Sequence, residues 1–132
     1  MAASKPSSRK RAHDDDRAGL RAYEAAGVWE ADVFAEAVLD IVAQIPVGRV
    51  MSYGSIAAEL GSRASRQVGK VMAHYGSEAT WWRVVHSDGR PVDGYEATAL
   101  DHYREEGTPL RHGSSGYRID MRSAAWSPDP DR

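Results

Sequence analysis

Hydrophobic positions between residues 32 and 45 repeat with the period of a helix. The stripe follows the spacing i, i+4, i+7, i+8 and i+11, which places its members on one face. Its members are Phe34, Val38, Ile41, Val42 and Ile45. Pro46 ends the pattern, because the residue before a proline is disfavoured in the α region. The pattern predicts a scaffold helix over residues 32–45.

Two shorter helical patterns follow, on either side of Gly61. In the first, residues 55–61 read SIAAELG, with Ser52 placed to cap its start and Gly61 in the position that commonly ends a helix. The second spans about residues 64–75, and its apolar stripe consists of Ala64, Val68, Met72 and Tyr75. Two short helices joined by a Gly-containing turn predict a helix-turn-helix unit, whose second helix is normally presented to DNA.

A run of aromatic and β-branched residues comes next, WWRVV at residues 81–85, and continues as HSDGRPV. Asp-Gly between strand-like residues is a strong hairpin signal, so we expect two short strands around Asp88 and Gly89. The predicted fold class is therefore mainly α with a small β-hairpin, a winged helix-turn-helix.

The polar face of the second helix is unusual for a helix that reads the major groove. It carries Ser65, Arg66, Gly69, Lys70, Ala73 and His74, so small residues surround one arginine and one lysine. Long polar side chains are the usual readers of base edges. A small-residue face suits close approach to a DNA backbone or a minor groove. Gly69 costs about 1 kcal/mol relative to alanine in a helix, and a close approach at this point would explain it.

Charge is unevenly distributed along the 132 residues, whose formal net charge is −2. Residues 49–90 hold six basic and three acidic side chains, whereas residues 30–48 hold four acidic side chains and no basic one. Such a local basic face suits modest contact with phosphates. Residues 1–29 have almost no apolar periodicity, and we expect a disordered tail in which Arg9, Lys10 and Arg11 are solvated. Residues 30–132 are then one domain.

The chain contains no cysteine, which excludes disulfides, thiolate zinc sites and thiol nucleophiles. Its histidines, at positions 13, 74, 86, 102 and 112, lack metal-ligand spacing. We therefore expect no metal and no cofactor. No apolar run is long enough to cross a bilayer, so we expect a cytoplasmic protein without a membrane partner.

The stretch IPVGRVMSYGSIAAELG, followed by SRQVGKVM, resembles the DNA-binding domain of the O6-alkylguanine-DNA alkyltransferases. That family carries I-P-x-G-x-V-x-S-Y-G-x-I-A, then a recognition helix A-x-R-A-V-G-x-A-M, then the active-site P-C-H-R-V. Here the last motif reads Thr80-Trp81-Trp82-Arg83-Val84, so Trp81 occupies the position of the alkyl-accepting cysteine. This replacement is typical of the alkyltransferase-like proteins, and Trp126 followed by Pro128 is similar to their C-terminal end. The resemblance covers roughly residues 32–107.

The resemblance implies a non-enzymatic protein that recognises damaged DNA. It would bind duplex DNA containing O6-alkylguanine as a monomer, flip the base into a pocket and mark the lesion for another pathway such as nucleotide excision repair. Tyr53 would press on the phosphate 3′ to the flipped nucleotide, and Arg66 would take the place of the base in the stack. The implied DNA-binding residues are Ser52, Tyr53, Gly54, Ser65, Arg66, Gln67, Gly69 and Lys70. The implied base pocket consists of Tyr53, Trp81, Trp82 and Val84.

Several positions depart from the family pattern. Thr80 replaces its proline, Trp82 replaces the relay histidine and Gln67 replaces a small residue of the recognition helix. Glu106 would partner the relay histidine in the enzymes, and without that histidine we expect it only to cap or to be solvated. Arg83 is expected to be an ion-pair partner or a turn anchor.

Other interpretations remain open from the residues alone. Trp81 and Trp82 also suit the core of an ordinary winged helix, and Tyr53 by its pattern alone suits a core position. A winged-helix transcriptional regulator that reads sequence is the main alternative function. A hydrolase is disfavoured, because no Ser/His/Asp constellation or carboxylate pair occurs at a recognisable spacing.

Overall fold

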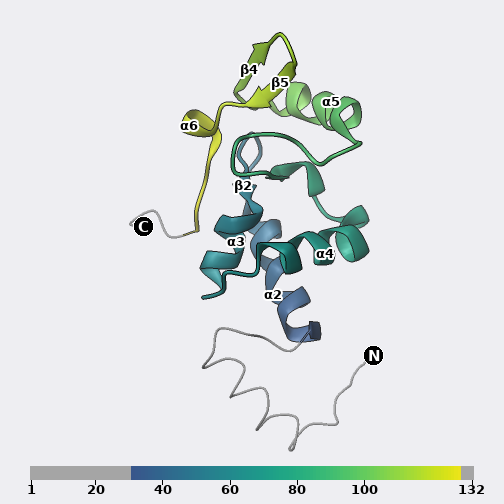
Figure 1. Ribbon diagram of the computed structural model, residues 1–132, viewed down its shortest axis with the longest axis vertical. Coiled ribbons are helices and arrows are strands. Elements are labelled where there is room, and N and C mark those ends of the chain that lie inside the picture. The colour runs from purple at the N-terminus through teal and green to yellow at the C-terminus, as the bar shows by residue number, and fades with distance from the viewer. Residues whose placement is uncertain (1–30, 129–132) are drawn as a thin grey trace, which may run out of the picture. The chain divides into compact units, whose positions relative to one another are not determined.

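The structure, a computed structural model, describes residues 31–128 (Figure 1). Within the described residues, one compact unit begins at Ala35. The predicted tail, with Arg9, Lys10 and Arg11, lies outside the described residues, so the domain boundary stays a prediction. Among the described helices, none combines the length and the apolar character needed to cross a membrane.

Three helices form where the hydrophobic pattern predicts them (Figure 1). They are α2 (Ala31–Gln44), α3 (Tyr53–Glu59) and α4 (Ser65–Tyr75). The apolar stripe of α2 is buried at Val38, Ile41 and Val42 and continues to Ile45 just beyond the helix. The prediction of a scaffold helix that ends before Pro46 is confirmed.

The helix-turn-helix unit consists of α3, α4 and the turn between them. The Ser52 side chain caps α3, because its Oγ accepts a hydrogen bond of 3.0 Å from the backbone N–H of Ser55. At its other end α3 stops at Glu59, and Gly61 takes the left-handed conformation (φ 68°) that commonly ends a helix. The two helices pack against each other, with Ile56 and Val68 fully buried.

The predicted hairpin around Asp88 and Gly89 is wrong in its pairing. Strand β3 (Val84–Val85) pairs in parallel with β2 (Met51–Ser52) and not with the residues that follow it. A turn does form there: the N–H of His86 donates to the carbonyl of Arg90, and the N–H of Gly89 to that of His86. Pro91 then lacks the N–H that a continuing ladder would need.

Gly89 instead joins this turn to a distant strand. Its carbonyl accepts a 2.8 Å hydrogen bond from the N–H of Ile119, and a Cβ at position 89 would lie 2.4 Å from the Ile119 carbonyl oxygen. With φ at 89° as well, the position requires glycine. The Asp-Gly pair thus indicated a turn correctly, but the turn serves tertiary packing.

The hairpin of this fold lies later in the chain. Strands β4 (Leu110–Gly113) and β5 (Gly116–Ile119) pair antiparallel around Ser114 and Ser115. They follow helix α5 (Glu96–Glu106) and precede the short α6 (Met121–Ala124) (Figure 1). The predicted class, mainly α with a small β-hairpin and similar to a winged helix, is therefore confirmed, with the hairpin displaced.

A hydrophobic cluster connects α5, the hairpin and the β2–β3 region. Its buried members are Val50, Val85, Ala99, Tyr103, Ile119 and Ala124. Half-buried aromatic side chains pack against it, including Trp81 and Trp82 from the 3₁₀-helix η2 (Trp81–Arg83). The C-terminal segment closes the cluster, because the N–H of Val50 donates to Ala124 and the N–H of Trp126 donates to Val50. This cluster fixes the wall of the candidate site.

Candidate nucleic-acid interface

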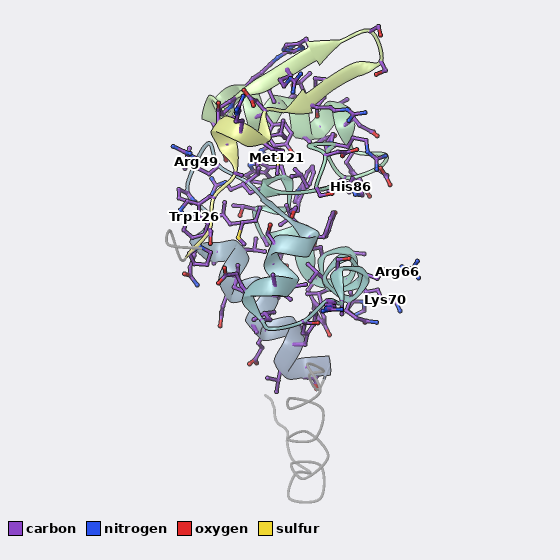
Figure 2. The ribbon with its side chains drawn as sticks, turned by 60° about the vertical axis from the view of Figure 1, so that its left-hand side comes forward. Arg49, Arg66, Lys70, His86, Met121 and Trp126 are labelled. Atoms are coloured by element: carbon purple, nitrogen blue, oxygen red, sulfur yellow. The ribbon has the colours of Figure 1, made fainter. Side chains whose placement is uncertain are left out.

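One face of α4 presents its polar side chains to solvent. Arg66, Gln67 and Lys70 are exposed there, while Val68, Val71 and Met72 hold the opposite face in the core. Figure 2 shows the side chains of Arg66 and Lys70 extending away from the helix on the same side of the molecule. Both are free to meet a phosphate backbone.

Gly69 lies between these exposed side chains and a hollow in the surface. Apart from its chain neighbours and the nearby backbone of α4 itself, a Cβ at this position would meet no atom of the described chain within 4 Å. Protein packing therefore does not require glycine here. An approaching external group explains its presence better than an internal contact does.

Two adjoining hollows lie beside α4. The smaller, of about 460 Å³, includes Tyr53, Gly54, Ser65, Arg66 and Gly69 in its lining. The larger has a volume of about 540 Å³, and its lining includes Tyr53, Gly69 and Trp81. Tyr53 and Gly69 are shared by both hollows, so most of the predicted DNA-binding residues gather around one depression.

The parallel pairing of β2 with β3 places Tyr53. Ser52 pairs with Val85, so the next residues, Tyr53 and His86, lie side by side with ring centroids 5.4 Å apart. Burial, and secondarily the charge of Asp93, raises the pKa of the Tyr53 phenol, which stays a neutral hydrogen-bond donor. Ser52 itself is buried (6% exposed) and its hydroxyl donates to Ser55, so its side chain is engaged inside the fold.

Trp81 forms an aromatic wall of the larger cavity. Its ring meets those of Tyr95, His102 and Trp82 edge to face, each at a centroid distance of 5.7 Å. Such contacts hold the indole in one orientation. Trp81 is thus at once a cavity wall and a member of the packing around the core cluster.

The other two residues predicted for the base pocket, Trp82 and Val84, do not line this cavity. Val84 is fully buried, because β3 pairs with β2 and turns this side chain into the core. Trp82 stacks on His102 with centroids 3.6 Å apart and planes within 5° of parallel. Trp82 also contacts the Trp81 ring and so supports the wall from behind, whereas Val84 belongs to the buried interior.

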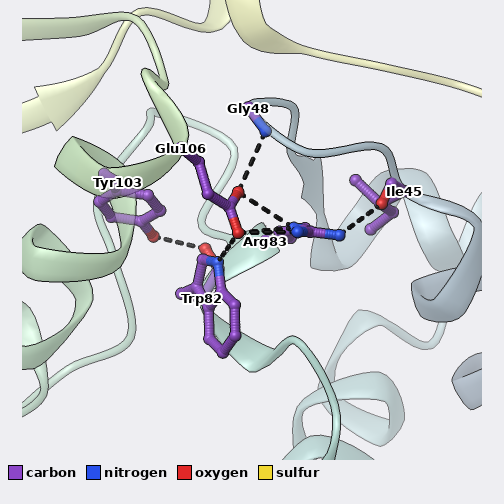
Figure 3. A network of polar contacts seen from close by, with 6 residues as sticks. All are labelled: Ile45, Gly48, Trp82, Arg83, Tyr103 and Glu106. Carbon is purple, nitrogen blue, oxygen red and sulfur yellow. Dashed lines mark hydrogen bonds and ion pairs between the residues drawn. The ribbon is translucent and has the colours of Figure 1, made fainter.

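Glu106, expected only to cap or to be solvated, is instead the centre of a polar network (Figure 3). Its carboxylate accepts hydrogen bonds from Trp82 Nε1 at 2.8 Å, from Gly48 N at 3.0 Å and from Arg83 Nη2 at 2.7 Å. The expectation is therefore wrong, because Trp82 itself supplies an N–H where the family has a relay histidine. The network is completed by Tyr103, whose hydroxyl donates to the carbonyl of Trp82.

The ion pair of Arg83 with Glu106 confirms the structural role expected for Arg83. Both side chains are nearly buried, at 12% and 11% exposure, and Arg83 also donates to the carbonyl of Ile45 at 2.8 Å. Burial raises the pKa of Glu106, but the hydrogen bonds it accepts, chiefly from Arg83, outweigh this effect. The pKa of Glu106 therefore lies below its ordinary value.

Several lining residues of the larger cavity were not predicted from the sequence. Val92, Asp93 and Tyr95 belong to the segment between the Gly89 turn and α5, and Thr98 lies in the first turns of α5. The only signal in the sequence was the loop composition of residues 91–94, PVDG, since loops on a rigid scaffold often carry binding residues. Within residues 31–128, no three His, Asp or Glu side chains are grouped to hold a metal ion.

Comparisons with known proteins agree with this geometry. The family model of the 6-O-methylguanine DNA methyltransferase, DNA binding domain, matches residues 33–106. Alkyltransferase-like protein 1 of Schizosaccharomyces pombe is 35% identical over 105 residues, which are 74% of this chain and 97% of that protein. The DNA base-flipping protein of Escherichia coli is 37% identical over 102 residues, 73% of this chain and 76% of that protein.

Solved structures show the same similarity. The crystal structure of S. pombe Atl1 in complex with damaged DNA containing O6-carboxymethylguanine has a TM-score of 0.64 at 35% identity, and covers 74% of this chain and 97% of that chain. A second S. pombe complex with DNA has a TM-score of 0.63 at 34% identity, with the same coverage.

Proposed function

Because the chain belongs to the alkyltransferase-like proteins of the 6-O-methylguanine DNA methyltransferase family, we propose that it binds duplex DNA containing O6-alkylguanine without repairing it directly. The damaged nucleotide is extruded from the duplex and its base enters the cavity between Tyr53 and Trp81. The bound protein then marks the lesion for another pathway such as nucleotide excision repair.

The observation that carries this proposal is the continuity of the site. The exposed face of α4, with Arg66, leads through Gly69 directly into a cavity of about 540 Å³ walled by Trp81. A helix that contacts the backbone and a base-sized hollow beside it are the two elements that base flipping requires. A sequence-reading winged helix has no need of the second.

The energetics favour the damaged base. Extrusion costs a few kcal/mol, and it costs least for a base that is already weakly paired. Alkylation at O6 removes guanine's normal pairing pattern, so the alkylated base is the easier one to extrude. Stacking of the base on the Trp81 indole stabilises the extruded state by about 1–3 kcal/mol. Arg66 fills the gap that the base leaves in the duplex.

Alkyl transfer by the route of the related enzymes is not available to this chain. A thiolate is the nucleophile in that reaction, and the chain has no cysteine. The position of the relay base is also engaged, because the Trp82 N–H donates to Glu106. The exposed face of α4 and the cavity beside Trp81 support binding of the damaged base without alkyl transfer.

Binding to matched duplexes tests the proposal. One duplex contains a guanine and the other contains O6-methylguanine at the same position. We expect tighter binding to the methylated duplex and no change in protein mass after incubation. Equal affinity for the two duplexes, or a mass increase of one methyl group, would overturn the proposal.

A further inference from the structure

Among the described residues that line the larger cavity, Asp93 is the one that carries a formal charge at neutral pH. The neutral walls consist of Tyr53, Met72, Ser77, Trp81, Tyr95 and Thr98, together with smaller residues. Within residues 31–128, no lysine or arginine lines this cavity. The neighbouring hollow also includes Asp93, which therefore lies where the two hollows meet.

Asp93 is held at this position by a turn. The N–H of Tyr95 donates to the carbonyl of Val92 at 3.1 Å, and Gly94 has φ 84°. The Asp93 side chain is 76% exposed, and within residues 31–128 no Lys or Arg forms a salt bridge with it. The neighbouring His86 Nε2 lies 3.4 Å from Oδ1 without forming a hydrogen bond. The carboxylate is thus not neutralised by a permanent cation.

The field of Asp93 reaches the cavity wall. After burial, its charge is the second cause that raises the pKa of Tyr53, which lines the same cavity. A group that enters the cavity meets the same field. Two like charges about 6 Å apart in a water-like medium repel enough to change Kd about threefold, and more where water is excluded.

Building on the proposed function, we infer that Asp93 makes this cavity selective by charge. O6 substituents that are neutral or cationic are accepted, and substituents that carry a carboxylate are disfavoured. A carboxylate taken out of water needs a cation or several hydrogen-bond donors, and the side chains of the described lining residues offer hydroxyl groups and the Trp81 indole N–H but no cation. The site therefore sorts alkylated bases by the charge of their O6 substituent.

A pair of isosteric adducts isolates the charge. Duplexes containing O6-carboxymethylguanine or its amide, O6-carbamoylmethylguanine, differ little in shape and by one negative charge. Binding of each is measured against O6-methylguanine and unmodified duplexes at low ionic strength, where screening is weak. A pH near 8 keeps ordinary imidazole groups uncharged. The same four duplexes are used with Asp93→Asn and with Asp40→Asn, in which an exposed carboxylate of α2 outside both hollows is removed.

We expect the wild-type protein to bind the amide at least threefold more tightly than the carboxylate. Asp93→Asn should remove this ratio while Asp40→Asn leaves it unchanged. If both adducts bind equally, or if Asp93→Asn leaves the ratio intact, the inference is overturned while a preference for O6-methylguanine still upholds the proposed function. If no alkylated duplex is preferred over the unmodified one, the proposed function fails and the inference with it.

Discussion

Trp82 Nε1 donates a 2.8 Å hydrogen bond to Oε2 of Glu106, across 24 positions of the chain. This bond joins the segment that contains the former nucleophile position to the end of α5. Because the same carboxylate also accepts from Gly48 and Arg83, it connects three segments at one point. Glu106, for which the resemblance implied a relay histidine as partner, here holds Trp82, which contacts Trp81 of the cavity wall.

Removing the charge of Glu106 should therefore destabilise the protein. Glu106→Gln leaves the nearly buried Arg83 without its anion, and breaking one side of such a pair costs about 3 kcal/mol or more. Urea denaturation measures the loss. Glu105→Gln is the matched control, because Glu105 is exposed. This substitution should change the free energy of unfolding by less than about 0.5 kcal/mol. Similar losses in both variants would contradict the central role of Glu106.

The pKa of Glu106 predicts how stability depends on pH. Its folded-state pKa lies below the ordinary 4.5, so the folded state holds fewer protons than the unfolded state in this range. The stabilisation is fully present above the unfolded value and is lost as the pH falls through the folded pKa. We expect the wild-type protein to lose stability relative to Glu106→Gln as the pH is lowered from about 6 to 3. Parallel stability curves for the two proteins would argue against the depressed pKa.

Arg66→Ala should weaken binding to O6-methylguanine duplex about tenfold and leave the melting temperature unchanged, because Arg66 is exposed. If Arg66 fills the gap left by the flipped base, the loss on unmodified duplex is smaller. A simple phosphate contact predicts equal losses on both duplexes and a shallower salt dependence. Lys70→Ala, on the same face, provides the comparison for a phosphate contact. Unchanged affinity for damage in a stable Arg66→Ala protein would refute the role.

Gly69→Ala separates stability from function. Alanine is favoured in a helix by about 1 kcal/mol, and its Cβ would meet no atom of the described chain beyond the nearby backbone of α4, so the variant should be more stable. If DNA approaches the backbone at this point, affinity for both duplexes should fall at the same time. Thermal melting measures the expected gain in stability, and duplex titration of the same sample measures the expected loss of DNA affinity. A variant that is stabilised and binds normally would show that Gly69 is not part of the interface.

Trp81→Ala tests whether this indole is a wall for the base. Loss of a stacking partner should reduce the preference for the alkylated duplex by about 1 kcal/mol, roughly fivefold in Kd. The half-buried side chain should cost less stability than the ~3–5 kcal/mol of a fully buried tryptophan. A large loss of stability with an unchanged preference would make Trp81 a core residue only.

Trp81→Cys asks whether restoring the nucleophile restores the reaction. We expect no methyl transfer, measured as protein mass, because Trp82 stands where the relay base should be. A thiol without such a base keeps an ordinary pKa of about 8.5 and is mostly protonated at neutral pH. Appearance of a methylated protein would show that the relay is dispensable in this fold.

The helical half of the fold could be predicted from local patterns, because its determinants are local. The stripe from Val38 to Ile45, the cap at Ser52 and the left-handed Gly61 each act within one or two turns. The order of the motifs also indicated the family correctly, which the family model and the relatives confirm.

The β segments could not be predicted in the same way, because strand pairing depends on distant partners. The local sequence predicts that Val84 and Val85 form one strand of a hairpin. Their backbone groups pair instead with β2, which lies more than thirty residues earlier. The hairpin that does form turns at Ser114 and Ser115, which is a weaker turn signal than Asp-Gly. Likewise, nothing local connects Glu106 with Trp82 or Asp93 with the cavity of Trp81.

The backbone contact of Val50 with Ala124 and Trp126 also constrains how the chain reaches its native state. These partners are more than seventy positions apart, so loop-closure entropy must be overcome before the contact contributes any stability. During synthesis α3 and α4 can associate early, because they are neighbours in the chain. The cluster behind Trp81 cannot be complete until Ala124, one of its buried members, has left the ribosome. The wall of the cavity is therefore among the last parts of this protein to be completed.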